Sequence, residues 1–545
     1  MKKNTLLGVA LATIVSVATL SCQKDKITIT EFTATMENCN DENGKVMLDG
    51  NVLRWTDGDQ IAVWGTDGKG IYTTTNTGTY ATTFTFTEGE DPGDPNYTAI
   101  YPASWAQRSA IMFLPPVQTS HDGRLETFPM MAKSSTSELV FKNLCGALRL
   151  RLQANGKSVT GIELVANQNI WGSYRIDYNS GNPTLSYYTN GSKQLLLSIV
   201  TPQNISTQAK DFYIALPPAT YGEGFTIRIY ASDGSVCTKT ITEGHSFTIA
   251  RSGIFTITLN NDNLQFEPNA GLLSGEFSVS PTKKVRFSQG NLMYTGFGTH
   301  AVATGGAAEG TWMFDDKWNG DYGDDYSSKW IGTFAWATSG WNSGANCYLP
   351  YQSGQGTGSQ DFMPGGDASN NLTGSYAYAD WGVYNAIFNG GNQPGLWRTL
   401  SAEEWDYLLN QRTGHSMKWG VAEVWNLGKG LVILPDRFSL PDGLDFNEGT
   451  SLSDNYWDYT LNQYSSEQWD QMEAAGAVLL LGDSYGLGYY WTVTASDVNN
   501  NGGEYSSYVL HVSGNNVEIT KCKRRGQGLN NYDPYTSVRL VRDVQ

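Results

Sequence analysis

The sequence is poor in the residues that bind metals or cross-link a small fold. It holds five isolated histidines and six cysteines, with no CxxC pair. A zinc site needs Cys and His ligands at short spacings, and a disulfide framework is typical of much shorter secreted chains. The pattern therefore argues against both in this chain of 545 residues.

Basic residues are also few. Lys and Arg number 36 against 53 Asp and Glu, which gives a net charge of −17. Contacts to phosphates need clustered cations, so nucleic acid is not an expected partner, and a basic face for anionic lipid is not expected either. The imbalance is concentrated in residues 271–545, which hold 29 acidic and 16 basic residues, and 13 of the 17 tryptophans follow residue 311. Two compositions in one chain predict two kinds of domain.

Long apolar runs are missing except at the start of the chain. Lys2 and Lys3 precede an apolar stretch at residues 6–20, which is typical of a secretory signal and short for a membrane span. The stretch ends in Ser21-Cys22, which resembles a bacterial lipobox; an ordinary signal with a chance cysteine is the alternative. We expect cleavage before Cys22 and its acylation, for instance with palmitate. The polar tag at residues 23–26 resembles the signal for the outer face of the Gram-negative outer membrane.

Period-two alternation dominates the first half. Residues 27–35 alternate apolar or β-branched residues with polar ones, and similar short runs recur up to residue 259, separated by Asp-Gly turns. No amphipathic helix is expected before residue 260. Many short strands at this spacing predict an all-β sandwich, or two in series.

Five segments of this half resemble, in order, the fimbrillin (Mfa-like) family. They are residues 54–63 with the pattern W-x-x-G-D-x-I-x-V, and residues 100–103, 113–115, 141–150 and 215–218. The resemblance covers about residues 27–260 and implies a pair of transthyretin-like β-sandwiches in a cell-surface lipoprotein. Singly, each residue is interpreted as core or turn: Trp55 fills the sandwich, and Gly58 allows the bend before Ile61.

The chain departs from this family at one place. Polymerising fimbrillins are trimmed by an Arg-specific protease in an early loop, and this chain has no Arg between Cys22 and Arg54, which lies inside the strand motif. The resemblance therefore implies a tip, an anchor or an independent adhesin more readily than a polymerising stalk.

The second half has a mixed pattern of helices, strands and loops. Ser401 and Glu404 predict a capping box for a helix over residues 400–409, and Ser465 or Ser466 caps a second helix up to residue 474. Residues 299–392 are rich in Gly, Asn and Asp but carry six tryptophans, so they are expected to fold as loops packed by aromatic rings. Most of the 13 tryptophans should be core, with two or three at the surface. The pattern predicts an α+β domain.

Residues 396–405, 489–492 and 537–542 resemble elements of C-type-lectin-like domains of the formylglycine-generating-enzyme type. The resemblance covers about residues 275–545, and the segments are also similar to paralogous surface domains of Gram-negative anaerobes. That enzyme needs two late cysteines that hold copper, whereas Cys522 stands alone here and Cys347 is far away. No enzyme activity is therefore expected.

One short loop of the second half is a candidate binding site. Its ligand-binding candidates are Asp315, Asp316, Trp318, Asp321, Asp324 and Asp325. Dense carboxylates are the ligands that Ca²⁺ prefers, but their spacing is not that of an EF-hand, and a solvated acidic loop is the alternative. Exposed Trp and Tyr rings stack on pyranose sugars while polar groups bind the hydroxyls, which makes a glycan the expected ligand class.

Together these patterns predict a mainly β protein of tandem sandwiches followed by an α+β C-type-lectin-like domain. The expected divisions are a signal at 1–21, sandwiches at 22–150 and 151–260, a linker at 261–274 and the last domain at 275–545. We expect a lipid-anchored, surface-facing, non-catalytic adhesin that binds a host glycan or protein. The alternatives are a fimbrial tip or anchor joined to pilin subunits by strand exchange, and an accessory protein of polysaccharide utilisation.

Overall fold

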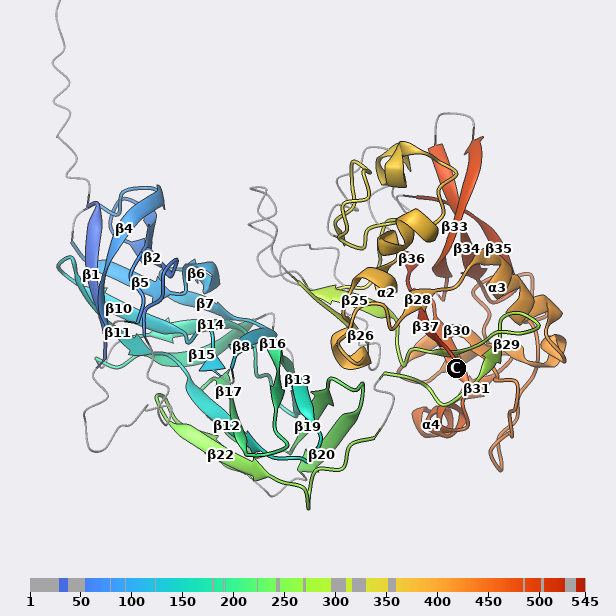
Figure 1. Cartoon of the computed structure of the whole chain (residues 1–545), viewed down its shortest axis with the longest axis horizontal. Coiled ribbons are helices and arrows are strands. Elements are labelled where there is room, and N and C mark those ends of the chain that lie inside the picture. The colour runs from blue at the N-terminus through green and yellow to red at the C-terminus, as the bar shows by residue number, and fades with distance from the viewer. Residues whose placement is uncertain are drawn as a thin grey trace, which may run out of the picture.

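The chain is mainly β, with two β lobes in tandem followed by an α+β part, as the sequence predicts (Figure 1). The computed structural model describes residues 29–37, 54–78, 80–93, 95–122, 124–178, 181–189, 191, 193–222, 224–241, 246–267, 271–295, 310–315, 330–350, 359–483, 486–500, 504–524 and 536–544. Figure 1 shows three lobes, with the second between the other two, and we call them the first, second and C-terminal lobes.

The first lobe is a closed barrel of seven strands. In order around the barrel these are β1 (Glu31–Met36), β11 (Glu138–Asn143), β10 (Met130–Ser134), β5 (Tyr97–Tyr101), β2 (Gln60–Trp64), β3 (Lys69–Thr73) and β4 (Ala81–Gly89). β1 closes the ring because it pairs in parallel with β11 and antiparallel with β4. The expected alternation holds in β1, where Phe32 and Ala34 are buried and their neighbours on either side are not.

Trp55 lies at the centre of this barrel, as expected. Its side chain is fully buried and makes edge contacts with the rings of Phe84, Tyr101 and Phe141. Gly58 has a φ of 86°, which a residue with a Cβ rarely adopts, and this allows the turn that leads into β2. Burying these rings removes large apolar surfaces from water, and the edge-to-face geometry adds to that stabilisation.

The described residues of the second lobe form three larger sheets and one two-stranded sheet. A six-stranded sheet has the order β20 (Val236–Ile241), β19 (Phe225–Ala231), β13 (Ser158–Ala166), β16 (Gln194–Asn204), β8 (Val117–His121) and β9 (Arg124–Leu125). Its core is completed by the sheet of β17 (Lys210–Leu216), β12 (Gly146–Leu152) and β22 (Ile254–Leu259), and by β18 (Ala219–Tyr221) paired with β21 (Phe247–Ile249). The last sheet contains β15 (Thr184–Thr189), β14 (Gly172–Asp177), β7 (Ile111–Leu114) and β6 (Ala106–Arg108).

Strands from before residue 150 take part in this second lobe. β8 pairs in parallel with β16, and β7 pairs antiparallel with β14. Strand pairing therefore crosses the expected boundary between residues 150 and 151, and the division into two sandwiches at that boundary stays a prediction. The strand pairs join segments about 60 to 80 residues apart, which a reading of local periodicity does not detect.

The C-terminal lobe contains four small sheets. The first two are β23 (Phe277–Ser278), β24 (Lys284–Phe287), β37 (Leu540–Asp543) and β28 (Arg398–Thr399), and then β26 (Thr311–Phe314), β25 (Leu292–Thr295) and β27 (Trp330–Ile331). The other two are β31 (Gln463–Tyr464), β29 (Trp419–Val424), β30 (Gly428–Ile433) and β32 (Val478–Leu481), and then β35 (Val517–Lys523), β34 (Glu504–Val512), β33 (Gly488–Asn500) and β36 (Thr536–Ser537). β37 pairs with both β24 and β28. It therefore joins β24, near the start of the lobe, to β28 in the middle of its sequence.

The helices are short, and both expected caps form. They are α2 (Trp381–Tyr384), α3 (Ala402–Asp406) continued by the π-helix η7 (Tyr407–Gln411), α4 (Ser466–Ala474), and the 3₁₀ turns η1 (Ala103–Trp105), η3 (Ser359–Phe362), η4 (Pro364–Gly366), η5 (Gly374–Ala379), η6 (Phe388–Gly390) and η8 (His415–Met417). Ser401 and Glu404 form the predicted capping box of α3. Of the two serines that could cap α4, Ser465 is the N-cap, with Gln468 as its partner. None of the described helices is long and apolar enough to cross a membrane.

The second and C-terminal lobes are packed against each other. Leu196 of β16 and Tyr230 of β19 share a buried apolar cluster with Met293, Met313 and Phe388 of the C-terminal lobe. The segment 261–274, expected as a linker, is bonded to both lobes: Glu267 exchanges two backbone hydrogen bonds with Val236, and Leu273 donates its backbone N–H to the carbonyl of Phe287. The connection between the lobes is therefore a packed junction.

Candidate functional site

The structure describes one residue of the predicted acidic loop. Asp315 follows β26 and donates its backbone N–H to the carbonyl of Asn291 at 2.9 Å. The other loop candidates (Asp316, Trp318, Asp321, Asp324 and Asp325) and the lipidation residue Cys22 lie outside the described residues. In the part of the chain that the structure describes, no group of three His, Cys, Asp or Glu side chains could hold a metal ion. Calcium binding by the loop stays a prediction.

The tryptophans of the C-terminal lobe divide as expected. Seven of them are buried and form its cores: Trp312, Trp336, Trp381, Trp397, Trp405, Trp469 and Trp491. Trp425 is 72% exposed at the β29–β30 turn, and Trp341 is half-buried. The four described cysteines are buried, namely Cys145, Cys237, Cys347 and Cys522.

Four aromatic side chains line up on one surface of this lobe. We call Trp341, Tyr376, Tyr378 and Tyr384 the aromatic ridge. The ring centroid of Trp341 lies 6.5 Å from that of Tyr376 and 5.9 Å from that of Tyr378, which in turn lies 6.0 Å from Tyr384. Tyr378 is 55% exposed and Tyr384 39%. The two adjoining exposed rings make this surface a candidate interaction site.

A buried serine holds the ridge together. Ser339 donates its hydroxyl to the carbonyl of Tyr378 at 2.7 Å and accepts the backbone N–H of Trp341 at 3.2 Å. The amide nitrogen of Asn385 donates to the carbonyls of Ser339 at 2.8 Å and of Trp381 at 3.0 Å. Ser339 is thus hydrogen-bonded to residues of three chain segments. These contacts to the backbone, and not contacts between the exposed rings, hold the ridge in place.

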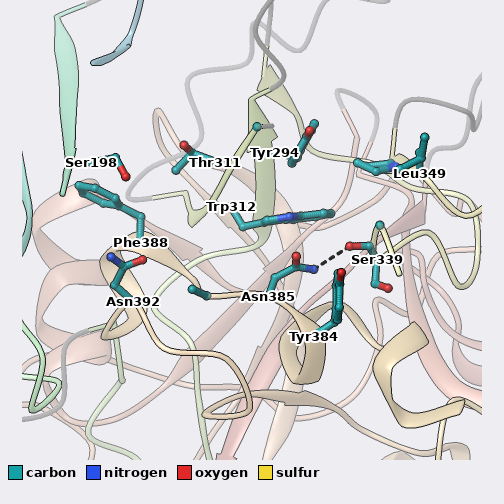
Figure 2. A pocket seen from close by; sticks show the side chains of 14 residues that line it. Ser198, Tyr294, Thr311, Trp312, Ser339, Leu349, Tyr384, Asn385, Phe388 and Asn392 are labelled. Carbon is teal, nitrogen blue, oxygen red and sulfur yellow. Dashed lines mark hydrogen bonds between the residues drawn. The ribbon is translucent and has the colours of Figure 1, made fainter. Parts of the chain in front are cut away.

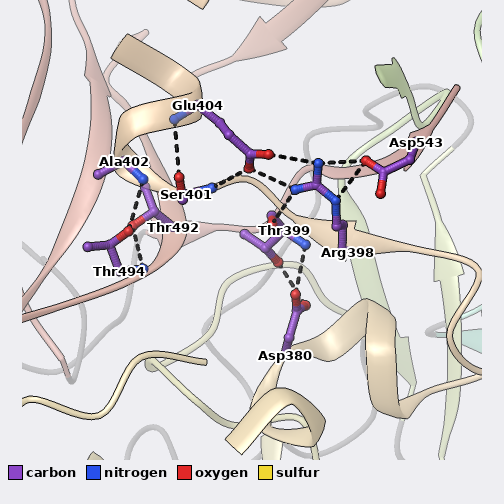
Figure 3. A network of polar contacts seen from close by, with 9 residues as sticks. All are labelled: Asp380, Arg398, Thr399, Ser401, Ala402, Glu404, Thr492, Thr494 and Asp543. Atoms are coloured by element: carbon purple, nitrogen blue, oxygen red, sulfur yellow. Dashed lines mark hydrogen bonds and ion pairs between the residues drawn. The ribbon is translucent and has the colours of Figure 1, made fainter. Parts of the chain in front are cut away.

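Asp380 anchors the single turn of α2 that carries Tyr384. Its carboxylate accepts the backbone N–H of Gly382 at 3.1 Å and both the backbone N–H and the hydroxyl of Thr399, at 2.8 and 2.9 Å (Figure 3). Burial raises the pKa of Asp380 to about 6, and these hydrogen bonds oppose the rise. The side chain thus joins α2 to β28 beneath the ridge.

Next to Asp380, Arg398 forms a paired network with two carboxylates. Its guanidinium binds Glu404 through two hydrogen bonds of 2.7 and 2.8 Å and Asp543 at 2.6 Å (Figure 3). Burial lowers the pKa of Arg398, but the hydrogen bonds and charges of Glu404 and Asp543 outweigh it and raise the pKa above its usual range. Since Glu404 also accepts the backbone N–H of Ser401, the network links the α3 cap to β28 and β37. Its groups are satisfied by one another, which indicates a structural role.

A pocket of about 400 Å³ opens beside the ridge at the junction of the two lobes (Figure 2). We call it the junction pocket. Tyr384 belongs both to the ridge and to the pocket wall, and Trp312 and Tyr294 add two further rings. The second lobe contributes Ser198, and Phe388 of η6 lies beside it. Fourteen described residues line the pocket, and none of them is charged. Aromatic walls with a few amide and hydroxyl groups suit the binding of a small polar ligand.

Sequence reasoning expected exposed aromatics but did not identify the ridge. It gave weight to Trp318 and the acidic loop, whereas the exposed rings at this site are mainly tyrosines. The only local signal was the alternation of tyrosines at residues 376 and 378, which resembles a strand but forms a 3₁₀ turn. The convergence of residues 339–341 with 376–385 depends on tertiary contacts.

Comparisons with known proteins give distant likenesses. No family model matches the sequence, and no curated protein matches it. Among solved structures, a candidate cell adhesion protein from Bacteroides ovatus has 12% identity and a TM-score of 0.28 over 44% of this chain and 94% of its own. The tip fimbrial protein Mfa3 from Porphyromonas gingivalis has 13% identity and a TM-score of 0.20 over 44% and 97%. A fimbrial protein from Bacteroides ovatus has 10% identity and a TM-score of 0.20 over 93% and 97%. These values are low, so the likeness assigns neither ligand nor partner to this chain.

Proposed function

We propose that this chain is a non-catalytic adhesin of the cell surface that binds glycans through the aromatic ridge. The observation that carries the proposal is the contiguous set of four rings, two of them exposed, beside a pocket whose described lining residues carry no charge. A pyranose presents a C–H face that packs on an aromatic ring while its hydroxyls find amide and hydroxyl partners, so the ridge offers several such platforms in a row. The resemblance of the second half to C-type-lectin-like domains supports the same conclusion.

Binding to glycans tests this proposal directly. The mature chain is applied to a glycan array, together with the double variant Tyr378→Ala/Tyr384→Ala. We expect retained folding and at least tenfold weaker binding, because both rings are exposed and contribute contact area. The matched control is Tyr187→Ala/Tyr188→Ala, since these tyrosines of β15 are 47% and 49% exposed but belong to the second lobe. Equal binding by both double variants would contradict the role of the ridge.

The proposed adhesin is tethered to the outer membrane by a lipid on Cys22 and faces outward. The support comes from the apolar signal followed by Ser21-Cys22 and from the resemblance of the first half to fimbrillin lipoproteins. A tethered array gains avidity even where single sites are weak. Metabolic labelling with palmitate should mark the wild-type chain in the outer-membrane fraction, and Cys22→Ala should remove the label. An unlabelled wild-type chain would rule the tether out.

A second candidate function is a fimbrial tip or anchor that is joined to pilin subunits by strand exchange. The observation that favours it is the position of β1, a six-residue strand whose two neighbours, β4 and β11, are both distant in sequence. An equivalent strand from another chain could make the same ladder bonds and fill the sites of Phe32 and Ala34. Ladders on unheated gels that disappear when β1 is deleted or stapled would support this function.

The acidic loop is proposed as a further part of the ligand surface. It follows β26, the strand that carries Trp312 and Thr311 of the junction pocket. Replacing Asp316, Asp321, Asp324 and Asp325 by Asn should weaken glycan binding, and calcium titration calorimetry on the wild type would show whether the loop holds a cation. Unchanged glycan binding by the Asn variant would remove the loop from the site.

A further inference from the structure

The junction pocket is shared by two lobes, and this determines which parts of the chain a ligand must contact. On β16, Leu195, Leu197 and Ile199 point into the core of the second lobe, while Leu196 packs against the C-terminal lobe. Because successive side chains of a strand point to opposite faces, Ser198 lies on the same face of β16 as Leu196. Ser198 lines the pocket. A ligand in the pocket therefore touches both lobes.

The amide groups at the pocket are already oriented by the fold. Asn385 uses its amide nitrogen on the carbonyls of Ser339 and Trp381, and Figure 2 shows the residue directly beneath Trp312. Asn392 uses its amide nitrogen on the carbonyl of Thr160 at 3.2 Å, across the junction. Asn385 uses both of its N–H groups on the protein and Asn392 uses one, so the two amide oxygens, which only accept, and one N–H of Asn392 are left to meet a ligand. The pocket thus favours a ligand that brings hydrogen-bond donors.

The charge of the wall limits the ligand further. No Lys, Arg or His is among the described residues that line the pocket, and no Asp or Glu either. A carboxylate or sulfate would lose its hydration without gaining a cation or a sufficient set of donors, which is costly. Hydroxyl groups, by contrast, can donate to the amide oxygens and also accept from Ser198 and Thr311.

We propose that the junction pocket binds one uncharged pyranose unit of a glycan, packed against the aromatic wall of Trp312 and Tyr384 and donating its hydroxyls to Asn385 and Asn392. This inference rests on the proposed function and names its ligand class. The volume of about 400 Å³ lies within the range of small-molecule sites. Because the sugar contacts both lobes, its binding also strengthens their docking.

The test uses the full mature chain and a panel of methyl glycosides measured by titration calorimetry. The neutral probes are methyl galactoside, mannoside and N-acetylglucosaminide, and the acidic probes are methyl glucuronide and sialoside. Ser198→Phe and Thr311→Phe each fill the pocket from one lobe without touching the buried core. Thr226→Phe is the matched control, because Thr226 is a half-buried residue of β19 outside the pocket.

We expect at least one neutral glycoside to bind, at least tenfold weaker affinity for it in both pocket-filling variants, and unchanged affinity in Thr226→Phe. Binding confined to acidic glycosides, binding of no neutral glycoside, or neutral binding unaffected by the pocket-filling variants would overturn the inference. The proposed function is judged separately, by the array. If Tyr378→Ala/Tyr384→Ala loses array binding but the pocket-filling variants do not, the proposed adhesin function stands and the proposed pyranose site in the pocket is wrong.

Discussion

Phe388 of the C-terminal lobe lies directly over Gly161 of the second lobe, so closely that a Cβ added at Gly161 would lie 2.6 Å from its ring. The same ring makes an edge contact with Tyr230 at a centroid distance of 5.3 Å. Asn392 and Gln393 add hydrogen bonds to the carbonyls of Thr160 and Ser232. A glycine in the middle of β13 is explained by this close approach, because strands otherwise disfavour glycine.

Gly161→Val should separate the two lobes while each stays folded. Valine suits a strand, but its side chain would overlap Phe388, so the junction must open. Small-angle scattering should show a larger radius of gyration and a broader distance distribution. Gly222→Ala is the control, since a Cβ at that position meets nothing closer than 3.6 Å. An unchanged scattering profile for Gly161→Val would mean that the junction is not held by this contact.

Asp380 should give the chain a pH-dependent stability. Its pKa is raised from 3.8 to about 6 by burial, so the folded state binds the proton more tightly than the unfolded chain. Its contribution to the free energy of unfolding should therefore rise as the pH falls through 6 and level off near pH 4, by about 3 kcal/mol in total. Urea unfolding of the wild type and Asp380→Asn at pH 7.5, 6 and 4.5 measures the difference. A difference between the two proteins that stays constant with pH would refute the assignment.

Arg398→Met should destabilise the C-terminal lobe by about 1 to 3 kcal/mol, because the partly buried Glu404 would keep its charge without its hydrogen-bonded partner, while Asp543 is exposed and adds little. Adding Glu404→Gln to that variant should restore part of the loss, since the buried acceptor no longer carries a charge. Denaturant unfolding of both single variants and the double variant gives the coupling energy. Arg437→Met, at an exposed position, should change stability by less than about 0.5 kcal/mol. Strictly additive effects at Arg398 and Glu404 would speak against the pair.

Ser465→Ala should cost about 1 kcal/mol through the lost cap of α4, because the backbone N–H of Gln468 loses its acceptor. Ser466→Ala should cost less, since its hydroxyl donates only to the exposed carbonyl of Trp425. Thermal unfolding of the two variants compares adjacent serines in one background. The reverse order would assign the cap to Ser466.

Local sequence patterns predicted much of the secondary structure. β2 contains the second half of the W-x-x-G-D-x-I-x-V segment as expected, and both capping boxes occur where serine is followed three residues later by Glu or Gln. Burial of Trp405, Leu408 and Leu409 also agrees with the predicted helix face. The change from α to π geometry at Tyr407 was not predicted, because nothing in the local pattern distinguishes the two windings.

The sequence predicted the type of candidate site but not the residues that form it. The sequence indicated a mostly buried set of tryptophans in the second half, which holds for the described residues, and aromatic recognition of a ligand, which stays a prediction. It did not identify the aromatic ridge or the junction pocket. Tyr378 and Trp341 are far apart in the chain, and their rings meet because Ser339 joins the two segments.

By itself, the sequence determined the strands, the helix caps and the change of composition between the halves, because these depend on residues within a few positions of one another. Tertiary structure alone decided that β1 closes the barrel between β4 and β11, that Phe388 docks on Gly161, and that rings from separate loops form one surface. The physical reason is that such contacts depend on which distant segments exclude water together, and a one-dimensional pattern does not specify the partner.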